Sequence, residues 1–171
     1  MAKTSRCCRR SAVARLSLET PADVRLLDGG LSVGEALAAF NAAYPQAGAV
    51  ASFLGKVRPD GAVKALELTH YEPLTLPGME ALVARALERF ALDGVLAWHR
   101  IGVMTPGQPI VLVAAAARHR RAAFGAVDYL MDHLKSAAWF WKREKGGSGA
   151  EDGWRWIEPR AEDHADLARW K

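Results

Sequence analysis

The alternation of apolar and polar positions predicts a chain of strands and helices in mixed order. Period-two alternation or short apolar runs bounded by turn residues indicate strands. The expected strands are Val24–Leu27, Ala49–Val57, Val63–Tyr71, Val95–Ile101, Ile110–Ala117, Phe140–Lys145 and Trp154–Glu158. Helical spacing of apolar residues indicates helices. These are expected from Ser32 to Tyr44, over Met79–Phe90, from His119 to about Ala137 and over Glu162–Trp170.

The short connections between neighbouring strands predict antiparallel pairs. We expect Ala49–Val57 to pair with Val63–Tyr71 across the turn Pro59-Asp60-Gly61. The same reasoning pairs Val95–Ile101 with Ile110–Ala117, and Phe140–Lys145 with Trp154–Glu158. Helices interspersed with such pairs are typical of the α+β class with a mainly antiparallel sheet.

The net charge of +4 comes entirely from the first 21 residues, which contain five cations and one anion. Subtraction from the totals of 23 and 19 leaves 18 cations and 18 anions in residues 22–171. A nucleic-acid-binding domain usually carries a basic face, so the neutral body argues against a nucleic-acid partner. No apolar run is long enough for a membrane span, so no membrane partner is expected either.

Composition divides the chain into a basic tail, residues 1–21, and a domain of residues 22–171. We expect the tail to be disordered; its Arg- and Ser-rich sequence leaves a transit peptide as the alternative. Cys7 and Cys8 are the two cysteines of the chain and lie side by side in this tail. The cysteine-free body predicts a cytoplasmic protein, and any sulfur chemistry must use sulfur from another molecule.

Four groups of cations lie at the ends of the expected elements: Lys56 with Arg58, Arg118–Arg121, Lys135, and Lys142 with Arg143. Lys135 alone could be a surface residue that stabilises a helix C-terminus, and Lys142 could lie on a solvated strand face. Cations at the start of a helix are opposed by its dipole, so Arg118–Arg121 indicates a bound anion.

The usual catalytic and cofactor motifs are absent from the sequence. There is no G-x-S-x-G turn, no phosphate loop, no dinucleotide fingerprint and no metal-binding histidine pattern. We therefore expect no metal and no cofactor. The residues themselves predict a cationic, lysine-containing site for a small anion.

Six motifs in order make the chain resemble the large, catalytic subunit of molybdopterin synthase. The resemblance extends from about Val24 to Trp170. The motifs are FLGKVR (Phe53–Arg58), HRIG…PG (His99–Gly107), HRRAAF (His119–Phe124), DYLMDHLK (Asp128–Lys135), FWKRE (Phe140–Glu144) and WRWIEP (Trp154–Pro159). Two positions depart from the family pattern: Trp139 replaces a proline, and Gln108 replaces an acidic residue.

The resemblance implies an α/β hammerhead-type fold with an added antiparallel β subdomain. It also implies a homodimer at the core of a heterotetramer, with a small ubiquitin-like sulfur carrier at each outer end. The C-terminal Gly-Gly thiocarboxylate of this carrier would donate sulfur to cyclic pyranopterin monophosphate. The product would be the dithiolene of molybdopterin, made in molybdenum cofactor biosynthesis.

Carried over by motif, the resemblance assigns Lys135 and Lys142 as the catalytic residues. It assigns Arg58, His119 and Arg120, together with Lys56, to substrate binding, and Arg160 as an arginine that reaches the pocket from the neighbouring protomer. Two adjacent lysines disfavour each other's charged forms, so one of them could exchange protons during sulfur transfer. The alternative is a non-catalytic module that binds the sulfur carrier without turnover, and retention of both lysines favours the enzyme.

Overall fold

A mixed four-stranded sheet forms the centre of the computed structural model, which describes residues 21–59, 63–136, 139–146, 153–158 and 165–170. In order across the sheet, its strands are β1 (Ala22–Leu27), β4 (Gly94–Arg100), β6 (Pro109–Ala117) and β2 (Ala49–Lys56). β1 is parallel to β4, whereas the β4–β6 and β6–β2 pairs are antiparallel. β2 is therefore one edge of this sheet.

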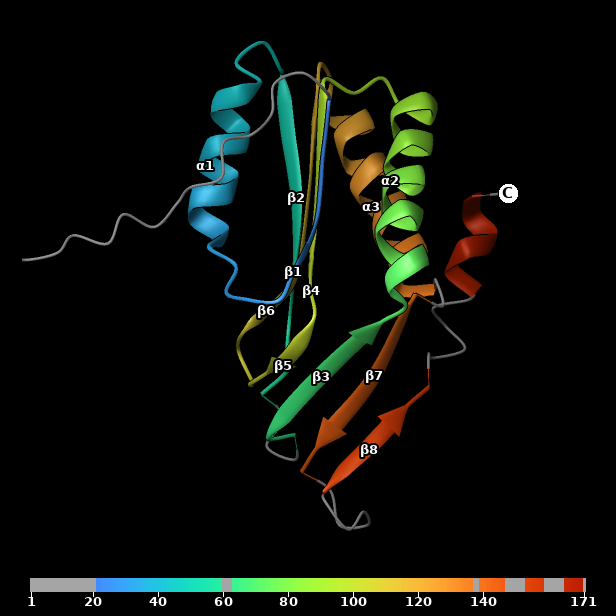
Figure 1. Cartoon of the computed structure of the whole chain (residues 1–171). Coiled ribbons are helices and arrows are strands. Elements are labelled where there is room, and N and C mark those ends of the chain that lie inside the picture. Colours follow the sequence, from blue (N-terminus) through green and yellow to red (C-terminus); the bar gives the residue numbers. More distant parts are fainter. Residues whose placement is uncertain (1–20, 60–62, 137–138, 147–152, 159–164, 171) are drawn as a thin grey trace, which may run out of the picture.

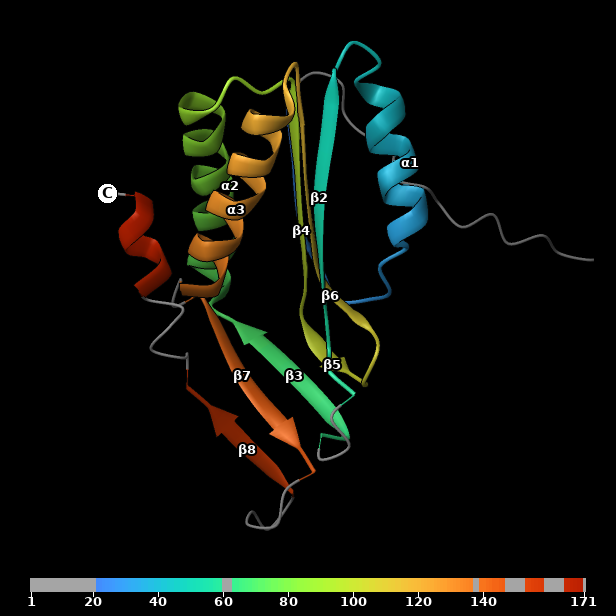
Figure 2. The same ribbon diagram turned by 180° about the vertical axis from the view of Figure 1, so that it is seen from behind.

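Three helices cover the two faces of this sheet: α1 (Val33–Ala43), α2 (Glu72–Arg89) and α3 (Arg120–Ser136). α2 and α3 lie together on one face and α1 lies on the other (Figures 1 and 2). Strand β6 is buried on both faces, which explains why its sequence is a continuous apolar run. No helix in the described part of the chain is long and apolar enough to cross a membrane.

A second, antiparallel sheet lies beyond the end of the first (Figure 1). In order, its strands are β5 (Gly102–Met104), β3 (Ala65–His70), β7 (Phe140–Lys145) and β8 (Trp154–Ile157). Leu66, Leu68 and Met104 are buried on its inner face and pack with Val57, which follows β2. This apolar contact joins the two sheets where the functional site lies.

The α+β class with mainly antiparallel strands is confirmed, but one expected pair is wrong. β2 and β3 do not form a hairpin: β2 pairs with β6, and β3 pairs with β5 and β7. Pairing with β6 gives β2 a long apolar partner, whereas the inner face of β3 covers a separate apolar cluster. The short strand β5 was not expected, and it adds a third pair to this sheet.

Helix α2 begins at Glu72, seven residues earlier than its apolar spacing predicts, despite containing Pro73 and Pro77. Pro73 lies in the first turn, where helical N–H groups have no partner within the helix. The Thr75 hydroxyl lies 2.9 Å from the carbonyl oxygen of Tyr71 and 3.1 Å from that of Trp139. These contacts fix the start of α2 against the segment that precedes β7.

Trp139 also packs directly on α2. A Cβ atom added at Gly78 would lie 2.6 Å from the Trp139 ring, so a glycine is required at this position. Trp139 therefore fills the space between α2 and β7. Of the expected C-terminal helix, residues 162–164 lie outside the described residues, and Leu167–Trp170 forms a 3₁₀ helix, η1.

Candidate active site

A cavity of about 640 Å³ lies at the junction of the two sheets, between the end of α3 and strands β7 and β8. Among the described residues that line it are five cationic side chains, two carboxylates and one histidine. They are Lys56, Arg58, Lys135, Lys142, Arg155, Glu144, Glu158 and His99. Subtracting two negative charges from five positive ones leaves an excess of three, which suits an anionic ligand.

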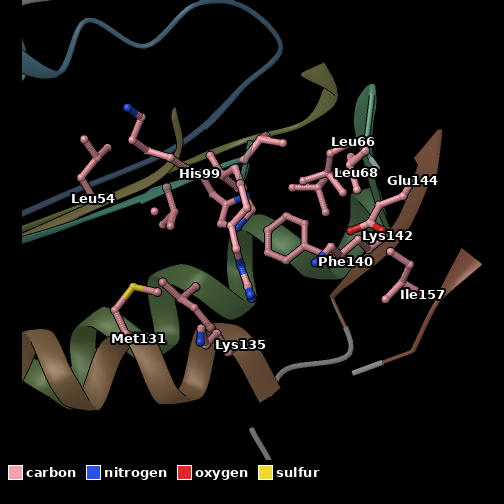
Figure 3. Close-up of a pocket in the computed structure, with 18 of the residues that line it drawn as sticks. Leu54, Leu66, Leu68, His99, Met131, Lys135, Phe140, Lys142, Glu144 and Ile157 are labelled. Carbon is pink, nitrogen blue, oxygen red and sulfur yellow. The ribbon is translucent and has the colours of Figure 1, made fainter. Parts of the chain in front are cut away.

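The two lysines reach this cavity from different elements. Lys135 lies in the last turn of α3, next to Leu134, which is buried in the main core. Lys142 lies on β7, where alternation turns Phe140, Lys142 and Glu144 inward. Figure 3 shows Lys135 on α3 at one side of the cavity and Lys142 and Glu144 on β7 at the other. The structure therefore brings together two lysines that lie in separate sequence motifs.

Lys56 and Arg58 line the cavity from the end of β2. The register of the β2–β6 pair shifts between Gly55, which pairs with Val111, and Lys56, which pairs with Pro109. A Cβ atom at Gly55 would lie 2.7 Å from the Val111 side chain, so a glycine allows the close approach of the two strands. The register shift passes over Ile110 of β6, and beyond it Lys56 and Arg58 line the cavity.

The C-terminal segment fixes the part of α3 that precedes Lys135. The Trp170 indole donates a hydrogen bond of 2.7 Å to the Asp132 carboxylate, and Arg169 forms an ion pair with the same carboxylate. Asp132 is buried despite its charge. These two donors satisfy the carboxylate and anchor the turn from which Lys135 extends.

His119 and Arg120 lie at the opposite end of α3 from Lys135. Lys135 follows Arg120 by fifteen residues. At a rise of roughly 1.5 Å per residue, the two are separated by about 22 Å along the helix axis. Neither His119 nor Arg120 lines the cavity of its own chain. Arg160, the remaining expected site residue, lies outside the described residues.

Sequence reasoning missed three charged residues of the cavity: Glu144, Arg155 and Glu158. Glu144 and Arg155 are register partners across β7 and β8. Alternation could have identified Glu144, since it lies two residues after Lys142 on the same strand. Arg155 required the register of the hairpin, which alternation within one strand does not give.

His99 on β4 is the other missed residue, and it lies on the cavity wall with 8% of its surface exposed. Its Nδ1 lies 2.8 Å from the carbonyl oxygen of Arg100. Its ring stacks on that of Phe140, with 4.0 Å between the ring centroids and an angle of 17° between the planes. Burial lowers the pKa of His99 to about 4, and the hydrogen bond to Arg100 offsets this only in part.

The lowered pKa of His99 predicts a loss of stability on acidification. Between the unfolded pKa of 6.5 and the folded pKa of about 4, the unfolded chain binds the proton and the folded chain does not. Stability therefore falls as the pH falls through this range. Between pH 7 and pH 5, the free energy of unfolding should drop by about 2 kcal/mol more in the unsubstituted protein than in His99→Gln. Urea unfolding at both pH values measures this, and equal drops would contradict it.

Metal binding has no support in the described residues, because no three His, Cys, Asp or Glu side chains among them lie close enough to hold an ion. The chemistry available to the cavity is that of amines, guanidinium groups, carboxylates and one imidazole. Amines can exchange protons, and guanidinium groups bind phosphate or carboxylate through paired donors. This arrangement fits acid–base chemistry on an anionic substrate.

Comparison with known proteins gives a consistent result. The MoaE protein family matches residues 28–137. The molybdopterin synthase catalytic subunit of Caulobacter vibrioides is 48% identical over 148 residues, which cover 86% of this chain and 96% of that protein. The corresponding subunit of Ralstonia nicotianae is 43% identical over 150 residues, covering 86% and 83% of the two chains.

Solved structures agree with the sequence relatives. The molybdopterin cofactor biosynthesis protein E of Burkholderia multivorans superimposes with a TM-score of 0.73 at 39% identity, covering 87% of this chain and 96% of that one. A complex of subunits 1 and 2 of the molybdopterin-converting factor from Helicobacter pylori has the same fold, with a TM-score of 0.69 at 21% identity, covering 80% and 91% of the chains. The chain therefore belongs to the MoaE family of molybdopterin synthase catalytic subunits, which act in molybdenum cofactor biosynthesis.

Proposed function

We propose that this protein transfers sulfur from the C-terminal thiocarboxylate of a small ubiquitin-like carrier to cyclic pyranopterin monophosphate, in the cytoplasm. The observation that carries this proposal is the convergence of Lys135, Lys142 and Arg58 on one cavity with excess positive charge. Both the phosphate-bearing pterin and the thiocarboxylate are anions, so the same cationic cavity suits both reactants.

The two lysines are proposed to handle protons and charge during the transfer. The thiocarboxylate sulfur attacks a carbon of the pterin substrate, the carbon–oxygen bond at that carbon breaks, and the oxygen leaves with a proton. Water then hydrolyses the resulting thioester, which leaves the sulfur on the pterin and releases the carrier with a C-terminal carboxylate; a second carrier repeats the sequence at the neighbouring carbon. A lysine amine at the reacting atoms can supply or accept the proton that each step requires. The other lysine, as an ammonium group, can hold the carboxylate end of the carrier tail. Arg58 supplies paired donors for the phosphate.

A sulfur carrier is the proposed protein partner. The structurally similar Helicobacter pylori protein was solved as a complex of the two subunits of its converting factor. The cavity of the present chain has an apolar wall formed by Leu66, Leu68 and Ile157 beside its charged groups. A narrow Gly-Gly tail could lie along such a wall and bring its terminal sulfur to the lysines.

A second copy of the chain is proposed to complete the site. The backbone positions of Arg120 and Lys135 are about 22 Å apart along α3, and neither His119 nor Arg120 lines the cavity of its own chain, so we infer that they reach the ligand from another protomer. The edge strand β2 and the start of α3 expose large apolar side chains: Val50, Phe53 and Leu54 at 38–40%, and Phe124 at 64%. Exposed apolar groups of this size favour association between protein chains.

These two associations give the expected heterotetramer. Two copies of this chain form its centre, and one carrier binds each outer end. Phe53 lines the active-site cavity and is also part of the exposed apolar surface. An interface on that surface would therefore extend to the edge of the cavity. His119 and Arg120 of one protomer would then bind the phosphate beside the lysines of the other.

Reconstitution tests the proposed function. The purified protein is mixed with thiocarboxylated carrier and cyclic pyranopterin monophosphate, and the dithiolene product is measured after conversion to a fluorescent derivative. Product formation that requires all three components is the expected result. Carrier binding without product would instead support the non-catalytic module. A control with carrier that ends in a carboxylate should give no product, because it supplies no sulfur.

A further inference from the structure

The imidazole of His99 is held in one orientation on the cavity wall. Its Nδ1 lies 2.8 Å from the Arg100 carbonyl oxygen. Its ring lies nearly parallel to that of Phe140, which is on β7 two residues before Lys142. The Arg100 carbonyl of β4 therefore holds one edge of the ring, and the Phe140 side chain of β7 holds one face. These two contacts set the position of the imidazole relative to Lys142.

The hydrogen bond to Arg100 determines which nitrogen carries the proton. A carbonyl oxygen can only accept, so Nδ1 must be the N–H donor. In the neutral ring, Nε2 then carries the lone pair and is a hydrogen-bond acceptor.

Burial keeps the ring of His99 neutral in a cavity that also contains charged groups. Lys56, Arg58, Lys135, Lys142 and Arg155 line the same cavity, and the nearby carboxylates are Glu144 and Glu158. Burial lowers the pKa of His99 to about 4, so the ring is neutral at physiological pH. A group of this pKa is a weak base near pH 7, which argues against a role in proton transfer.

We propose that Nε2 of His99 accepts a hydrogen bond from an N–H group of the heterocyclic substrate and so sets the orientation of that ring in the cavity. This inference rests on the proposed function. The cations of the cavity recognise the anionic part of the ligand, but they offer no acceptor. A ring N–H requires an acceptor. The acceptor side chains among the described lining residues are the carboxylates of Glu144 and Glu158 and the imidazole of His99, and the imidazole is the uncharged one. His99 is therefore a binding residue for the donor edge of the substrate.

Two substitutions separate substrate binding from a structural role. In His99→Gln, the side-chain amide can place an acceptor near the position of Nε2 but lacks the donor at the Nδ1 position. In His99→Asn, the shorter amide can still donate to the Arg100 carbonyl but does not reach the Nε2 position. His99→Phe keeps a ring against Phe140 and removes both polar atoms.

The test measures substrate affinity with and without turnover. Calorimetry with cyclic pyranopterin monophosphate alone gives Kd, and the reconstituted assay with saturating carrier gives KM and kcat. We expect His99→Phe and His99→Asn to raise Kd and KM at least about tenfold, with kcat changed less than about threefold. His99→Gln should stay within about threefold of the unsubstituted protein in all three quantities.

The results that would contradict the role of His99 differ from those that would contradict the proposed function. Unchanged Kd in His99→Asn and His99→Phe would overturn the inference. So would the reverse order, with His99→Gln impaired and His99→Asn normal, since that order indicates a structural role of the Arg100 hydrogen bond. If the unsubstituted protein bound the pterin but made no product, the proposed function would fail, and the Kd comparison would still decide the role of His99. Thermal melting checks that each variant is folded.

Discussion

Lys135→Ala is expected to lower the turnover of the reconstituted enzyme by at least about 100-fold, the lower bound for loss of a positioned acid–base group. Lys135 lines the cavity from the last turn of α3, opposite Lys142 on β7. Its removal takes away one of the two amines at the proposed reaction centre. Product formation at saturating carrier and pterin measures the effect, because saturation isolates turnover from binding.

Two further variants control this experiment. Lys135→Arg keeps a positive charge but cannot deprotonate, so it should bind the pterin and remain at least about tenfold slower if proton exchange is required. Lys145→Ala removes an exposed lysine from the same strand as Lys142 and should leave activity unchanged. Full activity of Lys135→Ala would contradict the assignment of Lys135 as catalytic.

Mixing two inactive variants is expected to restore activity if the site is shared between protomers. Lys135→Ala and Arg120→Ala should each be impaired alone. In a mixed dimer, one cavity contains both substitutions and the other contains neither. With random exchange, half of the dimers are mixed and half of their cavities are intact, so about a quarter of the unsubstituted activity should return.

The exposed apolar surface supplies the control for this mixing experiment. Adding Phe124→Asp to both variants introduces a charge on the surface proposed to join the protomers, and should abolish the restoration. Sedimentation velocity should show the same double variants as monomers. No restoration from stable mixed dimers would contradict a shared site and leave His119 and Arg120 without a role in the cavity.

Four of the five cations of the cavity could be predicted from the sequence because they belong to short motifs at the ends of elements. Lys56, Arg58, Lys135 and Lys142 all line it, as expected from their motifs. His99 was missed for a physical reason. A single histidine in an apolar strand usually satisfies its polar atoms within the core, and its position beside Phe140 depends on contact between two sheets.

Strand pairs were predicted correctly where neighbouring segments of the chain pair, and wrongly where a strand pairs with a distant one. The β4–β6 and β7–β8 pairs join segments close in sequence, and both are confirmed. β2 and β3 are just as close along the chain, but each pairs with a distant strand instead. Alternation of apolar and polar residues defines the two faces of a strand, but it does not show which strands form hydrogen bonds along its two edges.

The alternation of inward and outward side chains along strand β7 limits which sequence changes this strand can accept. Its inner positions carry Phe140, Lys142 and Glu144, and the positions between them face away from the cavity. An insertion or deletion of one residue within the strand would exchange these two sets, so that Trp141 and Arg143 would replace the inner residues. The strand should therefore tolerate many substitutions at its outward-facing positions, but no insertion or deletion of a single residue.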